Sequence, residues 1–511
     1  MPDTLDKSQT DLDARIDQLL GTGGRTFLAT SVGGNSSGAS VFYARDGDDL
    51  LFFTFNPTRK AEQIRVNPRV QLVVWPDGQH GIRGLQIDGF CSRIRDAREV
   101  EVAKEKILKV TDAFEHYMND EFLSRNNVTG YYRVRPSTIK YIDFHADPQF
   151  EWKEYPHNVP GVLRQAASTL SSRLLLWLRA LRAPFFTATL VPVLLGGILA
   201  WRQLFIAGLD FDWTLFWLCL GGALCAQAAT NLANDFGDHI SRNDEINQTP
   251  SPFNGGSRVI QAGLLEPWKV LAAALFFFGL CVACGLYINL LVGGSLLAPT
   301  PLLWIGLAGV LLGAAYTLGP WRLSYEGMGE IAIALGFGPI MVLGAHYVLT
   351  IPVAGAWHWL EPAVVSLPVA ILVLLIVWIN QFQDAPADYK SGKHNWVVRL
   401  AHNSGGFDYH SPFQWYVALN VMAFVLVGSI ALLPLVTPIG TAWAFLALLP
   451  ALLLPRSIAR GWDWISRADN ESVDWRRHPY ELLPVNVTTI GIHLLTGLLL
   501  ITAYGLDTVA G

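Results

Sequence analysis

The stretch that decides the fold is WTLFWLCLGGALCAQAATNLANDFGDHISRND at residues 213–244. Its first part is an apolar run long enough to cross a bilayer, since a spanning helix takes about 20 mostly apolar residues. Its second part carries Asn231, Asn234, Asp235 and Asp238, which fall at i, i+3, i+4 and i+7 and share one face of a helix. Polar side chains at the end of a membrane helix are costly unless they face a cavity. We therefore expect a membrane helix that ends in an internal polar site.

Apolar segments of similar length recur through the rest of the chain. Nine candidate spans can be assigned, at 184–201, 213–234, 269–292, 302–318, 329–350, 362–382, 413–433, 438–455 and 486–506. The first 160 residues, in contrast, hold 43 of the 79 Asp, Glu, Lys and Arg residues. An average soluble chain is about 25% charged, so we expect a soluble first third and a membrane-embedded remainder. The formal net charge of −5 predicts no nucleic-acid partner.

Lysine and arginine residues fall on alternate loops between these spans. Of the thirteen that follow Trp201, only Arg202 lies in the set of loops opposite to the other twelve. Cytoplasmic loops carry the excess of Lys and Arg in membrane proteins. We therefore expect a multi-pass protein of the inner (plasma) membrane, with the N-terminus and the 456–485 loop in the cytoplasm and Gly511 outside.

The sixth span runs into a second polar motif, NQFQDAPADYKSGKHNWVVRL at 380–400. Asn380, Asp384 and Asp388 fall at i, i+4 and i+8, again on one helical face. Pro386 interrupts the motif, and a proline inside a helix removes a hydrogen bond and is expected to bend it. Both motifs lie on the cytoplasmic side by the charge argument, so we expect them to meet at one end of a helical bundle.

Two facing clusters of carboxylates repel each other unless cations lie between them. Ligand sets made of oxygen alone select hard ions, and Mg²⁺ prefers to share a few carboxylates with substrate phosphates. The same loops hold Arg258, Lys390, Lys393 and Arg399, which suit an anionic group. One Asp-rich loop is usually only a solvated loop, but two matched stripes are hard to explain that way. They predict a diphosphate site at the mouth of an apolar bundle that accepts a lipid tail.

The soluble part has a different pattern. Residues 25–95 predict short strands separated by Gly, Asp, Asn and Pro. An amphipathic helix is expected at 98–120 and a closing strand at 131–144. A small β-barrel with a helix between strands is the simplest fold for this pattern.

The order of these elements resembles the FMN-binding split barrels of the pyridoxamine 5′-phosphate oxidase-like group, over roughly residues 12–150. The resemblance is based on FFTFNPTRKAEQIRVNPRVQLVV, LQIDGFCSRIRDAREVE and VRPSTIKYIDF. It implies that Thr54, Arg59 and Lys60 meet the flavin phosphate, and a dianionic phosphate does suit a charge-assisted donor cluster. It also implies a homodimer. An empty barrel, or haem or a deazaflavin in place of FMN, stays open.

The apolar part resembles the UbiA superfamily of membrane prenyltransferases over about 180–506. NLANDFGD and NQFQDAPADYKSGK resemble the two Asp-rich motifs of its 1,4-dihydroxy-2-naphthoate polyprenyltransferase branch. Further landmarks of that branch are resembled by RAPFFTATLVPVLLG at 182–196, YTLGPWRLSYEGMGE at 316–330 and LLPVNVTTIGIHLLTGLLL at 482–500. The stretch SPFNGGSRVIQAG departs from the Arg-Gly-Pro-Leu-Arg type run of the naphthoate enzymes, which leaves the aromatic acceptor open.

The resemblance implies a role for each residue of the two motifs. Asp235, Asp238 and Asp244 would hold one Mg²⁺ on the prenyl diphosphate, and Asp384 and Asp388 would hold the second. The substrate residues that it implies are the amides Asn231, Asn234 and Asn380, the cations Arg258 and Lys393, and the pocket residue Tyr316. An interfacial aromatic is the other interpretation of Tyr316, and Glu330 and His493 are open in the same way.

The resulting fold class is multidomain: an N-terminal split β-barrel (α+β), then an all-α integral-membrane bundle of about nine transmembrane helices. The domains are expected at 1–155 for the flavin-type barrel, 156–180 for a linker and amphipathic lead-in, and 181–511 for the prenyltransferase part. The expected function is Mg²⁺-dependent polyprenyl transfer from a prenyl diphosphate to an aromatic acceptor, with 1,4-dihydroxy-2-naphthoate implied by the branch.

Other readings stay open. Within the superfamily, the acceptor can be 4-hydroxybenzoate, a tetrapyrrole, a phenazine-like ring or a glycerol lipid. The alternative from another class is a transporter with a cytoplasmic regulatory barrel. Transporters tend to place coupling carboxylates near the midplane of the membrane, whereas both motifs here lie at span ends, which favours the enzyme.

Overall fold

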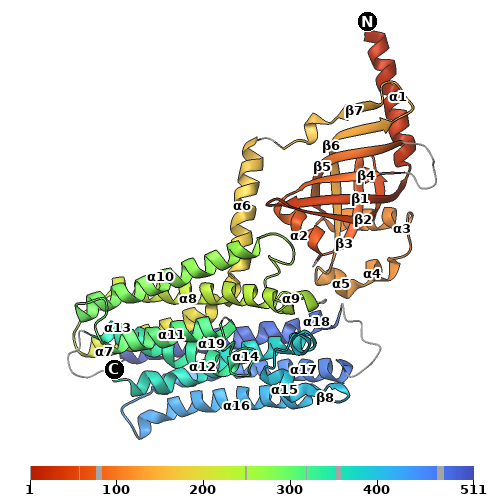
Figure 1. Cartoon of the computed structure of the whole chain (residues 1–511). Helices are drawn as coiled ribbons and strands as arrows, with labels where there is room; N and C mark the ends of the chain where they lie inside the picture. Colours follow the sequence, from red (N-terminus) through yellow and green to blue (C-terminus); the bar gives the residue numbers. More distant parts are fainter. Residues whose placement is uncertain are drawn as a thin grey trace. The chain divides into compact units, whose positions relative to one another are not determined.

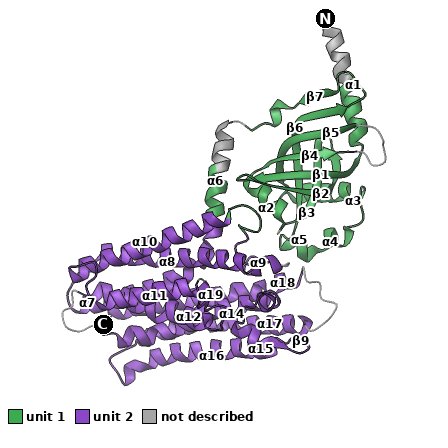
Figure 2. Ribbon diagram, viewed as in Figure 1, with its two compact units in different colours: residues 1–179, 259–266 green, residues 180–258, 267–511 purple. Residues whose placement is uncertain are grey.

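A computed structural model of the chain describes residues 2–56, 58–75, 83–160, 162–247, 250–317, 319–351, 358–468 and 477–510. The chain divides into two compact units, drawn in green and purple in Figure 2. Unit 1 comprises Met1–Arg179 and Val259–Glu266, and unit 2 comprises Ala180–Arg258 and Pro267–Gly511. The short segment Val259–Glu266 therefore packs with the first unit, although it lies between two stretches of the second in the sequence.

Unit 1 is built on a closed barrel of six antiparallel strands in its described part, as the sequence pattern predicted (Figure 1). The order β3-β2-β1-β4-β5-β6 closes because β3 also pairs with β6, and β7 extends the sheet beyond β6. The strands are β1 (Gly23–Val32), β2 (Asn35–Asp46), β3 (Asp49–Phe55), β4 (Arg69–Val74), β5 (Arg83–Arg93), β6 (Thr129–Asp143) and β7 (Phe150–Glu154).

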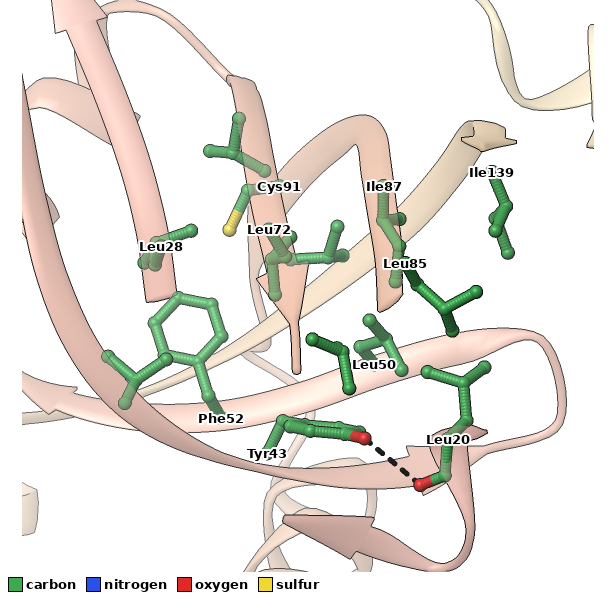
Figure 3. Packing of buried hydrophobic residues seen from close by; sticks show 14 of the residues in the cluster. Leu20, Leu28, Tyr43, Leu50, Phe52, Leu72, Leu85, Ile87, Cys91 and Ile139 are labelled. Atoms are coloured by element: carbon green, nitrogen blue, oxygen red, sulfur yellow. Dashed lines mark hydrogen bonds between the residues drawn. The ribbon is translucent and has the colours of Figure 1, made fainter. Parts of the chain in front are cut away.

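The core of the barrel follows from the alternation of its strands, because successive side chains point to opposite faces. Leu28, Leu50 and Leu72 are fully buried inside it (Figure 3). The Tyr43 hydroxyl donates to the Leu20 carbonyl at 3.0 Å, which ties the first helix to this core (Figure 3).

Along the chain, the helices of unit 1 precede, separate and follow the strands of the barrel. They are α1 (Pro2–Leu20), α2 (Arg59–Val66), α3 (Ala97–Leu108), α4 (Glu115–Asn119), α5 (Glu121–Arg125) and α6 (Val162–Ala180), with a short 3-10 turn at Pro156–Asn158. The expectation of one helix at 98–120 was wrong in extent, because α3 ends at Leu108. The β-branched Val110 and Thr111 follow that end and lose side-chain freedom in a helix, and Asp112 favours a turn or cap over a helix interior.

Unit 2 is a helical bundle. In the described part of the chain, eight helices are long and apolar enough to cross a membrane, and a ninth apolar helix at Pro301–Thr317 has 17 residues. The eight are Ala183–Ile206, Trp213–Ile240, Pro267–Gly293, Gly329–Thr350, Leu360–Lys390, His410–Leu435, Ala442–Ala468 and His478–Ala510. This agrees with the predicted bundle of about nine and makes the chain an integral membrane protein.

The helices of unit 2 include several short segments that join the long ones. The α-helices are α7 (Thr187–Ile206), α8 (Trp213–Ile240), α9 (Asn243–Ile246), α10 (Pro267–Gly293), α11 (Pro301–Thr317), α12 (Gly329–Leu335), α13 (Met341–Thr350), α14 (Leu360–Lys390), α15 (Trp396–Ala401), α16 (His410–Leu432), α17 (Leu454–Ala468), α18 (His478–Glu481) and α19 (Leu483–Ala510). A two-stranded β8 (His402–Asn403) and β9 (Gly406–Phe407) hairpin follows α15, and Ala442–Leu453 is 3-10 helix.

Helix α14 forms the centre of this bundle. In its apolar window 72% is buried, against 11% for α10, so other helices enclose most of α14 whereas most of α10 is exposed. The helix also continues through Pro386 to Lys390. Asp384 and Asp388 therefore keep the one-turn spacing that places them on the same face.

Candidate functional site

The last turns of α8 hold Asp238 in a fixed position. Its carboxylate accepts hydrogen bonds from the Tyr325 hydroxyl at 2.8 Å, from Asn234 Nδ2 at 2.9 Å and from Lys393 Nζ at 3.2 Å. The side chain is only 4% exposed. These three donors hold the buried carboxylate in one orientation, which suits a ligand for a cation.

Asp235, on the same stripe, has different partners. It accepts from Arg182 and from the Ser257 hydroxyl, and it is 2% exposed. Arg182 adopts a left-handed backbone conformation, with φ of 53°, just before the first span. Sequence reasoning missed Arg182. The available signal was a lone arginine directly before a membrane helix, at the start of RAPFF.

The segment that follows α8 connects the first Asp-rich motif to the second by hydrogen bonds. Asn247 Nδ2 donates to Asp384 Oδ1 at 2.8 Å, and Asn243 Nδ2 donates to Asp388 Oδ1 at 2.8 Å. Lys393 Nζ lies 3.2 Å from Asp238 Oδ2 and 4.0 Å from Asp388 Oδ1. The structure therefore brings the ends of α8 and α14 together through amide and ammonium side chains.

Asp244, in α9, is a buried carboxylate that lacks a hydrogen-bond donor on one of its oxygen atoms in the described part of the chain. It is 3% exposed, and its Oδ2 has no hydrogen-bond partner in the described part of the chain. Burial raises the pKa of Asp244 well above its ordinary value, and the nearby Asp238 and Asp235 raise it further. A buried oxygen of this kind favours either a proton or a cation.

Lys393 has charged partners close to its side chain. Burial by itself lowers the pKa of Lys393, but Asp238 and Asp388 outweigh that effect and raise it above the ordinary value. The ammonium group is therefore held charged between the two carboxylates. In the part of the chain that the structure describes, no three His, Cys, Asp or Glu side chains form a ready metal-ligand group. The donors are nevertheless oxygen only, which suits a hard cation shared with phosphate oxygens.

A cavity of about 540 Å³ opens from these carboxylates into the bundle. Its polar end is lined by Asp238, Asp244, Asp384, Asp388 and Lys393, and residues of α8, α10, α11, α12 and α14 supply its apolar walls. A cavity with one anionic end and a long apolar body fits an amphiphile whose head is held through cations.

The remaining predicted residues fall into two groups. Asn231, Asn234, Asn380 and Tyr316 line the cavity, whereas Asp235 and Arg258 are not among its lining residues. The further contacts of this set are Asn231 Nδ2 to the Leu181 carbonyl at 2.9 Å, Asn486 Nδ2 to Asn380 Oδ1 at 2.6 Å, and Arg258 to the carbonyls of Asp244 and Asn247. Arg258 therefore braces the loop that carries Asp244.

Several polar residues of this site were not predicted. They are Asn243, Asn247, Ser257, Tyr325, Gln381 and Asn395, besides Arg182. All except Arg182, Ser257 and Tyr325 lie within or directly after the two Asp-rich motifs, so the density of amides around the carboxylates was the available signal. Their partners depend on loop conformation, which spacing alone does not give.

The end of strand β3 carries the residues predicted for flavin. Thr54 is buried, with its hydroxyl 3.3 Å from the Thr58 hydroxyl, and Arg59 and Lys60 begin α2. A side chain at Gly263 would come within 2.6 Å of the Arg59 guanidinium, so Arg59 lies against the segment Val259–Glu266 of the same unit. The three residues are close together, and their role with FMN stays a prediction.

Comparison with known proteins identifies both parts of the chain. The UbiA prenyltransferase family profile matches residues 189–477, and the pyridoxamine 5′-phosphate oxidase profile matches residues 12–134. A 1,4-dihydroxy-2-naphthoate octaprenyltransferase of Bacillus subtilis is 28% identical over 251 residues, covering 48% of this chain and 74% of that protein. A 2-carboxy-1,4-naphthoquinone phytyltransferase of Synechocystis is 24% identical over 342 residues, covering 66% and 96%.

Among solved structures, a putative pyridoxamine 5′-phosphate oxidase from Listeria innocua is 21% identical and covers 25% of this chain and 97% of its own. Its TM-score is 0.22, which is too low to establish a shared fold for the whole chain. The barrel assignment depends instead on the profile match and on the observed strand order.

Proposed function

This chain belongs to the UbiA prenyltransferase family, with a fused domain of pyridoxamine 5′-phosphate oxidase type, and from that premise we propose a Mg²⁺-dependent transfer of a polyprenyl group from its diphosphate to 1,4-dihydroxy-2-naphthoate. The observation that carries the proposal is the meeting of two carboxylate-bearing helix ends at the polar end of one apolar cavity. The names of the relatives from Bacillus subtilis and Escherichia coli support the acceptor.

The metal ligands in this proposal are five carboxylates, four of which line the polar end of the cavity while Asp235 lies behind that lining. Asp235, Asp238 and Asp244 would hold one Mg²⁺, and Asp384 and Asp388 the other. The orphan Oδ2 of Asp244 and the oxygen-only donor set fit such an ion. When bound, Mg²⁺ would stabilise the negative charge on the leaving diphosphate.

The cationic side chains of the chain complete the head-group site. Lys393 and Arg182 line the cavity beside the carboxylates and can donate charge-assisted hydrogen bonds to diphosphate oxygens. The amides Asn231, Asn234 and Asn380 line the same end and orient those oxygens. Arg258 acts through the loop, because it donates to the carbonyls of Asp244 and Asn247.

The apolar body of the cavity would hold the prenyl tail and exclude water. Departure of the diphosphate leaves an allylic cation, which the ring faces of Tyr316 and Phe337 in the cavity wall can stabilise. Water in this space would trap the cation, so a dry wall matters for the outcome. The carboxylated carbon of the electron-rich acceptor ring then attacks C1 of the tail. The ring afterwards loses its carboxylate as CO₂.

We also propose a location in the inner (plasma) membrane, with the N-terminal barrel in the cytoplasm. Arg202, the single exception to the Lys and Arg split, is paired with Glu361 at 3.2 Å and with Asp507 at 2.9 Å. The other twelve Lys and Arg residues after Trp201 fall on the alternate loops, which supports the cytoplasmic placement of the N-terminus. The barrel is proposed to bind FMN and to form a homodimer.

The direct test is product formation by the full chain. Purified protein in detergent is incubated with farnesyl diphosphate, Mg²⁺ and an equimolar pool of aromatic acceptors, and lipid-soluble products are identified by mass spectrometry. We expect a prenylated, decarboxylated naphthoquinol that disappears with EDTA. Prenylation of 4-hydroxybenzoate instead would replace the acceptor, and no prenylated product with any acceptor would contradict the proposal.

A further inference from the structure

Besides Asp244, three residues in the cavity wall carry buried oxygen atoms that have no hydrogen-bond partner in the described part of the chain. They are Ser324 Oγ, Glu330 Oε2 and Gln381 Oε1. Glu330 is 1% exposed and Ser324 is 3% exposed, so bulk water does not supply partners. A buried polar atom left without a partner costs about 1–3 kcal/mol. Three of them in the wall of one cavity indicate a polar ligand group.

The other oxygen of Glu330 is already held. Glu330 Oε1 accepts from Gln381 Nε2 and from the Trp396 backbone N–H, each at 2.9 Å. These two bonds orient the carboxylate and use the only side-chain nitrogen of Gln381. The oxygen atoms Glu330 Oε2 and Gln381 Oε1 are left together as acceptors on adjacent side chains.

This group lies next to the carboxylates of the proposed diphosphate site. Gln381 precedes Asp384 by three residues on α14, which is a rise of about 4.5 Å. Asn395 Nδ2 donates to Asp388 Oδ2 at 2.7 Å, and its neighbour Trp396 donates to Glu330. A ligand that touches Glu330 therefore sits within about one helical turn of the site where C1 of the prenyl chain would be held.

We propose that Glu330, Gln381 and Ser324 form the subsite that binds the ring hydroxyl groups of the aromatic acceptor, an inference that depends on the proposed function. An ionised glutamate has no hydrogen-bond donor, and Gln381 Oε1 is an acceptor, so both free oxygen atoms require a ligand that donates hydrogen bonds. A prenyl diphosphate has an anionic head and an apolar tail and offers no such donors. A dihydroxylated ring offers two hydroxyl donors, one for each acceptor.

Glu330 would then act directly in the reaction. The bond from C1 to the diphosphate oxygen breaks first, and its electron pair leaves with the diphosphate. The carboxylated ring carbon then attacks the allylic cation at C1, and a carbon–carbon bond forms. The electron pair of the adjacent O–H bond moves toward the ring to form a carbonyl, and Glu330 Oε2 takes the proton. Loss of CO₂ returns an electron pair to the ring, and Glu330 returns the proton to the oxygen.

The test is Glu330→Gln in the full chain, with farnesyl diphosphate and 1,4-dihydroxy-2-naphthoate as substrates. The variant keeps the size of the side chain and removes the anionic acceptor. We expect the KM for the acceptor to rise about tenfold or more, as for one hydrogen bond to a charged group. We also expect kcat to fall and the KM for farnesyl diphosphate to stay within about twofold of wild type.

A substrate-side variant shows whether the hydroxyl is what Glu330 binds. Methylating the ring hydroxyl next to the carboxylated carbon should lower kcat/KM in wild type and cause little further loss in Glu330→Gln, because the interaction is already absent. Glu361→Gln is the matched control. That glutamate accepts from Gly440 N at 2.9 Å and pairs with Arg202 away from the cavity lining, so both KM values should be unchanged.

Ser324→Ala provides a second variant in case Glu330→Gln does not fold, and we expect a smaller, about threefold rise in acceptor KM. Fluorescence titration of 1,4-dihydroxy-2-naphthoate without prenyl diphosphate gives a readout that needs no turnover. Wild-type acceptor KM and kcat in Glu330→Gln, or equal rises in both KM values, would overturn this inference alone. Failure of the wild type to prenylate or bind the acceptor would overturn the proposed function with it.

Discussion

Asp384→Asn separates the catalytic from the structural contribution of the carboxylate clusters. Asp384 accepts from Asn247 Nδ2 at 2.8 Å and from Gly255 N at 3.0 Å. Both bonds reach Oδ1, so an asparagine can keep both with its amide oxygen and loses only their charge assistance, about 1–1.5 kcal/mol for each bond. The same change removes repulsion with Asp388, one turn away, which is about 3 kcal/mol for two charges about 6 Å apart at an effective dielectric constant of about 20.

These two terms nearly cancel, so we expect the Tm of the purified protein to change by no more than about 3 °C. Activity should behave differently, because a metal site that loses an anionic ligand stabilises the leaving diphosphate much less. We expect kcat/KM to fall by at least about 100-fold, or roughly 2.7 kcal/mol of transition-state stabilisation.

The assay is initial-rate prenyl transfer at saturating Mg²⁺, with Tm measured by intrinsic fluorescence on the same preparations. Asp210→Asn is the control, because Asp210 is exposed in the loop before α8 and should change neither quantity. Wild-type turnover of Asp384→Asn would refute the two-metal assignment. A fall in Tm of more than about 10 °C would refute the balance of charge and hydrogen bonding worked out above.

Three further predictions concern topology and the barrel. A cysteine tag at the C-terminus should react with an impermeant reagent in intact cells, and protection would contradict the orientation with Gly511 outside. The excised segment 1–155 should be soluble and dimeric and bind FMN at tens of micromolar or tighter, and Arg59→Ala with Lys60→Ala should weaken binding about tenfold or more, as followed by flavin fluorescence. The hydrogen bond from Lys106 lowers the pKa of Asp46, so Asp46→Asn should reduce stability toward urea above about pH 4, the range in which the carboxylate is ionised in both states. The difference from wild type should shrink as the pH falls below that range, and a difference that stays constant would contradict this electrostatic explanation.

The sequence by itself determined the two-part organisation of this protein. Apolar run length and the uneven distribution of charge are local properties, so they separate a bilayer-embedded bundle from a soluble barrel without knowledge of packing. The stripes at Asn231–Asp238 and at Asn380, Asp384 and Asp388 were also predictable, because helical periodicity places residues three and four apart on one face. Helix α14 preserves that spacing even through Pro386.

Only the tertiary structure decided which donors hold each carboxylate. Arg182 reaches Asp235 from a left-handed turn, and Asn243 and Asn247 reach α14 from a loop whose course no periodicity specifies. Arg258 lies outside the cavity lining and donates to the Asp244 carbonyl of the same loop, which the sequence also did not indicate.

The Glu330 group shows the same limit most clearly. Its glutamate was visible in YTLGPWRLSYEGMGE, but nothing in that stretch indicates that Gln381 and Trp396 occupy one oxygen and leave the other without a partner. Whether a buried polar atom is satisfied depends on the atoms around it in space, which residues distant in the sequence supply, and so only the folded chain shows where a ligand is needed.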